Sequence, residues 1–148
     1  DDLGFDAGIN YTAVDDYRAA LDDVAPGGVD VYFDNVGGPI TDAVFTRLNL
    51  DARVAVCGQI AHYNDETVPT GPRKLPQIIT PRARVEGLLV SDFGTRFEHA
   101  TDQLATWVSA GDLTHRETIV DGLENAPDAF LGLFSGDNIG KQVVAVSA

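Results

Sequence analysis

Apolar residues along this chain follow two periods, one typical of buried strands and one typical of amphipathic helices. Continuous runs rich in valine and aromatic residues predict strands at 29–34, 53–57 and 84–90, with closing strands at 118–120 and 142–146. Apolar side chains spaced by three or four residues predict helices at 14–24, 39–48, 93–108 and 127–134. Gly111 and Gly136 mark the ends of the last two helices. The last helix should turn Phe130, Leu133 and Phe134 inward.

The alternation of continuous apolar strands with amphipathic helices favours an α/β fold, a parallel sheet with helices on both faces. The segment 61–81 interrupts this alternation with four prolines and many polar residues, which predicts a long loop. That loop leaves the carboxyl end of the strand at 53–57, and open α/β sheets bind their ligands at this edge. The loop is therefore a candidate functional segment.

Charge limits the classes of partner. The 148 residues include 23 acidic and 10 basic side chains, a formal net charge of −13, and this field repels phosphate backbones. We expect no nucleic-acid partner. The acidic residues are dispersed along the chain and are mostly aspartate, which predicts a halophilic protein whose self-repulsion is screened by concentrated salt. The alternative is an acidic protein from an organism of ordinary salinity.

Cysteine and hydropathy narrow the picture further. Cys57 is the one cysteine of the sequence, so neither an internal disulfide nor a cysteine-based zinc site is expected. The three histidines are dispersed, without the close spacing of metal ligands. No apolar run reaches the length of a membrane helix, and no basic region opens a signal peptide. We expect a cytoplasmic protein with no metal centre and no membrane partner.

Polar side chains stand at the predicted strand ends. Asp34 and Asn35 precede Gly37, and the pair fits either a turn with local hydrogen bonds or a ligand contact. Cys57, at the next strand end, fits a small buried hydrophobic residue better than a nucleophile. Tyr63 is either a loop anchor or a hydrogen-bond donor to a developing enolate oxygen. The Gly-x-Gly-x-x-Gly fingerprint of dinucleotide binding does not occur.

Five strings in sensible order carry a family resemblance: VYFDNVGG at 31–38, RVAVCG at 53–58, HYN at 62–64, RVEG at 84–87 and GDNIGK at 136–141. Together they resemble the zinc-independent medium-chain dehydrogenase/reductases of the prostaglandin reductase, leukotriene B4 dehydrogenase and 2-alkenal reductase branch. The resemblance implies reduction of the C=C bond of α,β-unsaturated aldehydes and ketones by hydride transfer from NADPH. The alternatives are a quinone reductase of the same superfamily and a truncated, non-catalytic nucleotide-binding or assembly module.

The resemblance also implies site residues. Tyr63 matches the tyrosine that hydrogen-bonds the substrate oxygen, and it is the expected catalytic residue. Tyr11 matches a tyrosine near the adenosine 2′-phosphate of NADP(H). The other implied cofactor contacts are Asn35, Cys57, Gly58, Ile60, Tyr63, Leu88, Leu89, Val90 and Asn138.

The family pattern further implies that the chain is the C-terminal portion of a longer enzyme and is inactive alone, because the glycine-rich turn lies upstream of the matched residues. Residues 1–110 then form the second half of a partial Rossmann-type sheet in an NADP-binding domain, with a strand of that sheet near 9–11. Residues 111–148 return to the catalytic domain. The family commonly dimerises through the strand from Arg84 to Val90, so we expect a homodimer.

Overall fold

The computed structural model describes residues 3–146, which form two compact units divided between Thr95 and Arg96. The first unit contains helices α1 (Tyr17–Val24) and α2 (Gly38–Phe45), strands β1 (Val29–Asp34), β2 (Leu48–Val56) and β3 (Arg84–Gly87), and the short 3-10 helices η1 (Ile60–His62) and η2 (Leu75–Ile78). A further 3-10 segment, η3 (Val90–Arg96), spans the division. The second unit contains α3 (Phe97–Ala110), β4 (Glu117–Asp121), η4 (Leu123–Asn125), α4 (Ala126–Ser135) and β5 (Lys141–Ala145).

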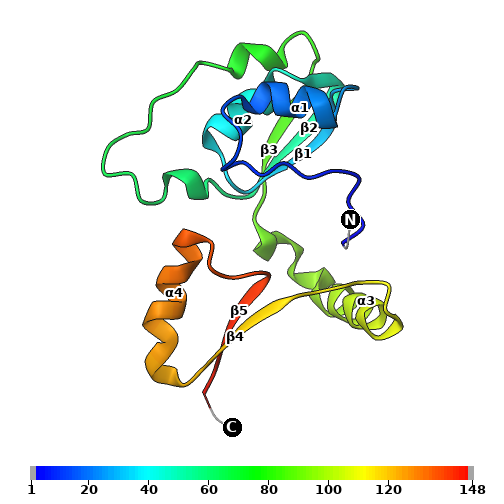
Figure 1. Cartoon of the computed structure of the whole chain (residues 1–148). Helices are drawn as coiled ribbons and strands as arrows, with labels where there is room; N and C mark the ends of the chain where they lie inside the picture. The colour runs from blue at the N-terminus through cyan, green and yellow to red at the C-terminus, as the bar shows by residue number, and fades with distance from the viewer. Residues whose placement is uncertain (1–2, 147–148) are drawn as a thin grey trace. The chain divides into compact units, whose positions relative to one another are not determined.

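The strands of the first unit form a parallel sheet in the order β1-β2-β3, and Figure 1 shows α1 and α2 together on one side of it. Tyr32, Val54 and Val85 are partners across the three strands and share the face toward α2. The buried apolar residues of the described chain gather here: Ala43, Val44, Ala52 and Val54. The opposite face leaves Val31 and Phe33 more than half exposed, at 59% and 58%. The predicted parallel α/β class is confirmed, but the expectation of helices on both faces is not met within this unit, because the face with Val31 and Phe33 is left uncovered.

Two of the predicted strands, β2 and β3, have bounds that differ from the prediction by more than one residue. β2 begins five residues before the predicted start, and it ends at Val56, one residue before Cys57. β3 was expected to reach Val90, but it ends at Gly87. The physical reason is the end of β2: Leu88 N–H donates to the Val56 carbonyl at 2.9 Å, and β2 offers no further residue to pair with. The chain then turns into η3 instead of continuing the apolar run as a strand.

The expected strand near 9–11 is wrong, because the structure has a turn there. The Asn10 side-chain oxygen accepts hydrogen bonds from the backbone N–H and the hydroxyl of Thr12, at 3.1 and 2.7 Å. Ala13 N–H donates to the Asn10 carbonyl at 3.0 Å. Asparagine favours this local bonding over a sheet ladder, so the strand that the family pattern implied does not form here.

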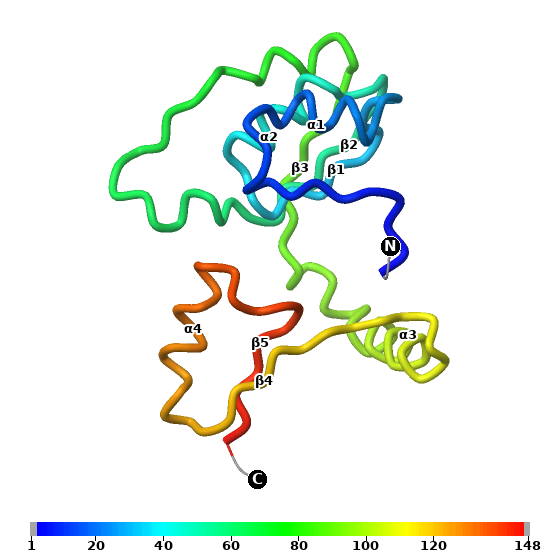
Figure 2. The backbone as a smooth tube through the Cα atoms, in the orientation of Figure 1, coloured from blue at the N-terminus to red at the C-terminus, as the bar shows by residue number. Residues whose placement is uncertain are grey.

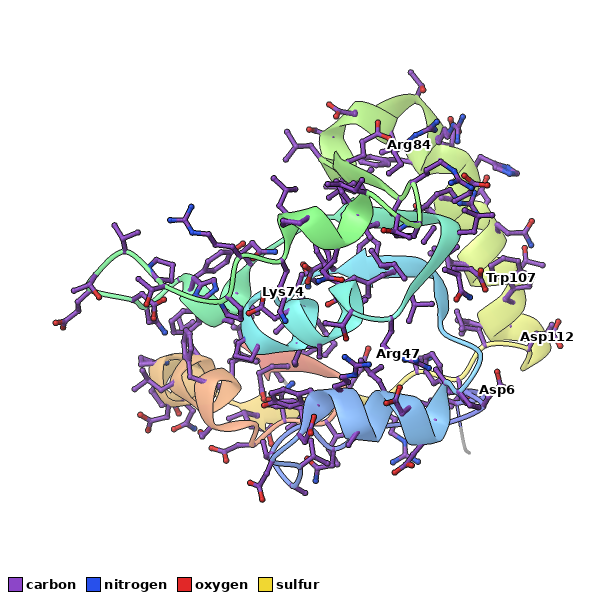
Figure 3. All side chains as sticks on the ribbon, turned by 90° about the horizontal axis from the view of Figure 1, so that it is seen from above. Asp6, Arg47, Lys74, Arg84, Trp107 and Asp112 are labelled. Atoms are coloured by element: carbon purple, nitrogen blue, oxygen red, sulfur yellow. The ribbon has the colours of Figure 1, made fainter. Side chains whose placement is uncertain are left out.

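Two further features of the first unit are an ion pair made by Arg47 and the long loop after β2. Arg47, labelled in Figure 3, places Nε 2.6 Å from Asp22 of α1 and donates through Nη2 to the Pro26 carbonyl at 3.1 Å. It thereby joins α1 to the chain before β2. The predicted loop 61–81 is confirmed apart from the end of η1 and the one-turn helix η2, and Figure 2 shows the loop swinging away from the strands before it returns to β3.

The second unit is a parallel pair, β4 and β5, joined by α4. The string at 136–141 is the helix-to-strand turn that its glycines predict, since Gly136 adopts a left-handed φ of 74° after α4. The inward orientation expected for Phe130, Leu133 and Phe134 is wrong within this unit, because all three are exposed. Two strands are too narrow to cover that apolar stripe, and Phe130 and Phe134 instead contact each other edge to face at 5.5 Å.

Candidate functional site

The turn after β1 is built around the carboxylate of Asp34, which ends the strand and is 0% exposed. Five groups donate hydrogen bonds to its two oxygens: the backbone N–H groups of Val36 at 3.1 Å and Gly37 at 2.8 Å, Tyr32 Oη at 3.1 Å, Thr41 Oγ1 at 2.7 Å and Gln59 Nε2 at 3.1 Å. A buried charge is stable when its lone pairs are satisfied in this way. The sequence left open a turn with local hydrogen bonds and a ligand contact, and for Asp34 the structure shows the turn.

These contacts shift two pKa values. Burial acts to raise the pKa of Asp34, but the hydrogen bonds from Thr41, Gly37, Val36 and Tyr32 outweigh it, so the pKa lies below the ordinary 3.8. Burial also raises the pKa of the Tyr32 phenol to about 12, assisted by the negative charge of Asp34 and opposed by the hydrogen bond with Thr41. Asp34 is therefore a fixed anion that organises the turn, and it has no proton to give at neutral pH.

The loop after β2 is attached to the same turn. Cys57 and Gly58 donate their backbone N–H groups to the Asp34 carbonyl at 2.8 and 3.2 Å. Ala61 N–H, in η1, donates to the Val36 carbonyl at 2.9 Å. These bonds place the start of the loop directly over the end of β1, at the carboxyl ends of two adjacent parallel strands.

Three predicted site residues meet at this point. A side chain at Gly58 would place its Cβ 2.6 Å from Asn35 Oδ1 and 3.4 Å from the Tyr63 hydroxyl, so a larger residue at 58 would have to displace the Asn35 side chain. Asn35 and Tyr63 are both exposed, Tyr63 at 68%. The arrangement therefore presents one amide and one phenol to solvent, side by side across a glycine.

The remaining residues expected in the first unit lie around this cluster or apart from it. Ile60 begins η1 and is exposed. Cys57 is exposed, so its interpretation as a small buried hydrophobic residue is wrong. Leu88, Leu89 and Val90 follow β3 next to the end of β2, and Leu88 also lines a hollow of about 350 Å³ on the open face of the sheet.

Tyr11 and Asn138, the two remaining predicted cofactor contacts, lie outside this cluster. Tyr11 is exposed in the N-terminal turn, where its carbonyl accepts a hydrogen bond from Tyr17 Oη at 3.3 Å. Asn138 belongs to the second unit, and its Nδ2 donates to the Gly140 carbonyl at 2.7 Å. The cofactor contacts implied for these two residues stay predictions.

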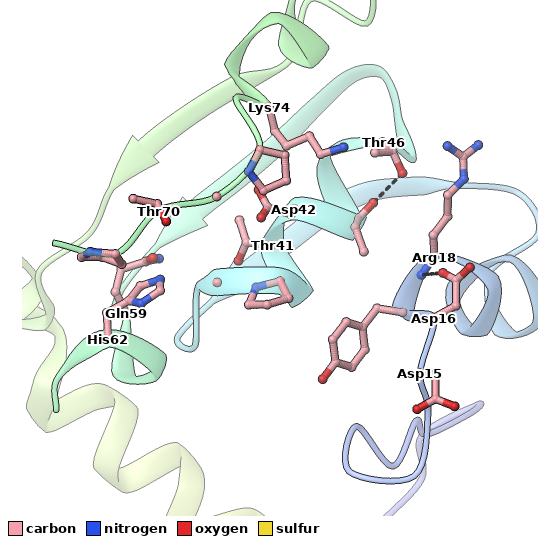
Figure 4. A pocket seen from close by; sticks show the side chains of 17 residues that line it. Asp15, Asp16, Arg18, Thr41, Asp42, Thr46, Gln59, His62, Thr70 and Lys74 are labelled. Atoms are coloured by element: carbon pink, nitrogen blue, oxygen red, sulfur yellow. Dashed lines mark hydrogen bonds between the residues drawn. The ribbon is translucent and has the colours of Figure 1, made fainter. Parts of the chain in front are cut away.

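A pocket of about 710 Å³ lies beside this cluster, between the start of α1, the helix α2 and the loop at 69–74 (Figure 4). Its lining includes Gln59 and His62 from the start of the loop after β2, together with Asp42 and Lys74. Asn35, Gly58 and Tyr63 are not among its lining residues. The pocket and the cluster are thus neighbours that share the loop after β2, and the sequence-predicted residues belong to the cluster.

Tyr32, Thr41 and Gln59, the three side chains that donate to Asp34, were not among the predicted site residues. The available signal was Asp34 itself: an acid closing an apolar strand requires donors, and the chain can supply them from the next helix and the next strand end. Within residues 3–146 no group of three or more histidine, cysteine, aspartate or glutamate side chains is arranged to hold a metal ion. Over the same described range, no helix has both the length and the apolar character needed to cross a membrane.

A parallel α/β sheet with polar side chains at the carboxyl ends of adjacent strands belongs to the class of folds that bind ligands at that edge. Residues 3–144 match the family model described as zinc-binding dehydrogenase, and the chain belongs to that family. The family resemblance stated from the five strings is thereby confirmed. Independence from zinc stays a prediction.

The chain is also similar to several individual proteins over nearly its whole length. The chain is 45% identical over 145 residues to the 2-alkenal reductase (NADP(+)-dependent) of Nicotiana tabacum, covering 98% of this chain and 42% of the relative. It is 40% identical over 150 residues to the NADPH-dependent curcumin reductase of Escherichia coli (strain K12), covering 98% and 43%. The crystal structure of CurA in complex with NADPH from Vibrio vulnificus matches with a TM-score of 0.88 and 39% identity, covering 100% and 45%. The chain thus spans less than half the length of these proteins.

Proposed function

We propose that this chain is the C-terminal part of an oxidoreductase that uses NADPH to reduce the carbon–carbon double bond of α,β-unsaturated aldehydes and ketones. The observation that carries the proposal is the meeting of Asn35, Gly58 and Tyr63 at the carboxyl ends of β1 and β2. Family membership and the names of the tobacco and Escherichia coli relatives support it.

The groups at this edge fit the nicotinamide half of the cofactor. The Asn35 amide both donates and accepts hydrogen bonds, as a carboxamide or a ribose hydroxyl requires, and the exposed Tyr63 phenol does the same. We assign contacts to this half of NADPH to Asn35, Cys57, Gly58, Ile60, Tyr63, Leu88, Leu89 and Val90. Tyr11 and Asn138 are the further proposed contacts, Tyr11 toward the 2′-phosphate.

Bound NADPH supplies the hydride that reduces the β-carbon of the substrate. The role of Tyr63 in this chain is to donate a hydrogen bond to the carbonyl oxygen, where negative charge develops as the β-carbon becomes saturated. A proton added at the α-carbon completes the reduction. Asn35 and the glycine at 58 fix the place where the two reactants meet, since hydride transfer depends on close and oriented approach.

The proposal includes an assembly and a division of the chain. β3 stands at the edge of its sheet, and an unpaired strand edge exposes backbone groups that another chain can bond. We assign this edge, from Arg84 to Val90, to a homodimer in which β3 pairs with its copy. Residues 1–110 belong to the NADP-binding domain and residues 111–148 to the returning segment, so α3 goes with the nucleotide-binding part.

The test is reduction of a simple enal by the complete protein that contains this chain. With NADPH and crotonaldehyde, we expect loss of NADPH absorbance and formation of the saturated aldehyde, identified by mass spectrometry. Menadione serves as the competing substrate. Turnover of menadione with no consumption of crotonaldehyde would overturn the proposal in favour of a quinone reductase, and failure to bind NADPH in a fluorescence titration would overturn both in favour of a non-catalytic module.

A further inference from the structure

We propose that Gln59 is a positioning residue: through its hydrogen bond to Asp34 it holds the loop carrying Gly58 and Tyr63 against the turn carrying Asn35. This inference rests on the proposed function, because the cluster it positions is the proposed meeting place of cofactor and substrate. It assigns a role to a side chain that neither the sequence pattern nor the cluster itself includes.

The anchor for Gln59 is complete without it. Asp34 is fully buried, and four of its five hydrogen-bond donors come from β1, from the turn that follows it and from α2. Gln59 Nε2 is the one donor from beyond β2, at 3.1 Å from Asp34 Oδ2. Removal of the Gln59 amide therefore leaves the turn bonded and removes only the side-chain bond between the turn and the loop.

The turn after β1 also leaves a space beside Gly37 that the Gln59 side chain occupies. Gly37 is buried, with φ 76° and ψ −161°, a conformation essentially restricted to glycine. A Cβ at Gly37 would lie 2.6 Å from Gln59 Cδ and would overlap its side-chain oxygen. The amide occupies the space that any other residue at 37 would fill, so the carboxylate and the glycine together define one position for Gln59.

The placement of Gln59 along the chain explains why this matters for the cluster. On one side, Gly58 N–H donates to the Asp34 carbonyl; on the other, Ala61 N–H donates to the Val36 carbonyl, and Tyr63 follows. Gln59 contributes the side-chain bond between these two backbone attachments. Without it, the loop keeps its two ends but loses the link that fixes the path between them.

The first arm of the test uses Gln59→Leu, which removes the donor and keeps an apolar side chain of similar size. In the cofactor-free protein, we expect hydrogen exchange of the segment 57–63 to accelerate while the melting temperature stays close to that of the native protein. In the loaded enzyme, kcat with crotonaldehyde should fall about tenfold or more, since displacement of reacting groups by about 1 Å can cost on the order of 100-fold. The matched control is Gln77→Glu, an exposed glutamine of η2 in the same unit.

The second arm uses Gln59→Glu and pH. Two ionised carboxylates at hydrogen-bond distance repel each other, which raises the pKa of one of them, and a proton shared between them at lower pH recreates the bond to Asp34. Relative to native protein, protection of 57–63 and kcat should therefore recover as pH falls, whereas Gln59→Leu stays low at every pH. The other titratable groups near this position are Tyr32 of β1 and, lining the neighbouring pocket, Asp15, Asp16, Tyr17, Arg18, Asp42, His62 and Lys74. Dividing each variant's pH profile by that of the native protein removes the contribution of groups that both proteins share. The Gln77→Glu profile should match the native one at every pH.

Unchanged exchange of 57–63 in Gln59→Leu overturns the positioning role, whatever the activity. Equal behaviour of Gln59→Glu and Gln59→Leu across pH also overturns it, because the proton-dependent bond would then be absent. If the native protein leaves crotonaldehyde unreduced while the exchange results follow expectation, the link between Gln59 and Asp34 is supported and the proposed function fails. The two failures are thus separated by the cofactor-free measurement.

Discussion

At the residue scale, Tyr63 and Asp34 show two different uses of a polar side chain. Tyr63 is mostly exposed and reaches the same glycine as Asn35, so its phenol is free to meet a ligand. Asp34 is buried, and both of its carboxylate oxygens accept hydrogen bonds from groups of the protein. The first arrangement suits catalysis, and the second suits the fixing of a turn.

Tyr63→Phe removes the hydroxyl and keeps the ring. We expect kcat with crotonaldehyde to fall about tenfold to 100-fold, because one donor to the developing oxyanion is lost, and the Kd for NADPH to stay nearly unchanged. Steady-state kinetics and a fluorescence titration measure the two quantities. An unaltered kcat would remove the catalytic role of Tyr63.

Asp34→Asn replaces an acceptor pair with one acceptor and one donor. At neutral pH we expect a loss of about 3 kcal/mol in the free energy of unfolding, the scale of a hydrogen bond to a charged group with one partner left unsatisfied. The pKa of Asp34 is lowered in the folded protein, so its stabilisation is present above the ordinary 3.8 and disappears as pH falls through the folded value.

Urea unfolding at a series of pH values measures this difference. The gap between native protein and Asp34→Asn should be constant near neutral pH and should shrink in acid. A gap of the same size at neutral and at strongly acidic pH would show that the carboxylate is not the stabilising form.

At the scale of elements, the sequence located most helices and strands because each is a local pattern. The Asp16 side chain caps α1 by accepting from Arg18 and Ala19 N–H groups, at 2.9 and 3.0 Å, as acids at a helix start favour. β3 ended early because its neighbour β2 ended, which is a property of pairing and not of the sequence of β3 itself. The cluster could be anticipated only as residues at strand ends, since its contacts join three segments.

Gly37→Ala tests the turn that joins β1 to α2. The positive φ and the overlap with the Gln59 amide should together cost about 1–3 kcal/mol in the free energy of unfolding. Gly27→Ala is the matched control, because a Cβ there meets no atom within 4 Å and the backbone needs no left-handed conformation. Thermal or urea unfolding compares the two. Equal stability of both variants would contradict the restriction at Gly37.

At the scale of the whole molecule, both units leave strand edges unpaired and apolar side chains exposed within the described residues. The sheet of the first unit ends at β1 and β3, and apolar side chains such as Phe33 and Phe130 are exposed on separate units. The chain spans less than half the length of the tobacco and Escherichia coli relatives. Adaptation to concentrated salt, favoured by the net charge of −13, stays a prediction.

The dimer proposed through β3 is tested with Val85→Pro. Leu88 N–H points to β2, and backbone groups alternate along a strand, so Val85 N–H points to the open edge. Proline there removes an outward donor and leaves the ladder to β2 in place. Light scattering of the complete protein should show a dimer for the native sequence and for Val85→Ala, and a monomer for Val85→Pro. A native monomer, or a dimer that survives Val85→Pro, would contradict pairing along this edge.

The sequence by itself determined the parallel α/β class, the places of the main helices and strands, and the family, because period, glycine punctuation and five ordered strings are all written along the chain. Only the tertiary structure decided that Asp34 is an anchor, that Gln59 bonds it, and that Gly58 brings Asn35 beside Tyr63. The reason is distance along the chain: these contacts span more than twenty residues, and no local period encodes which strand ends meet. Folding brings them together when β1 and β2 pair in register.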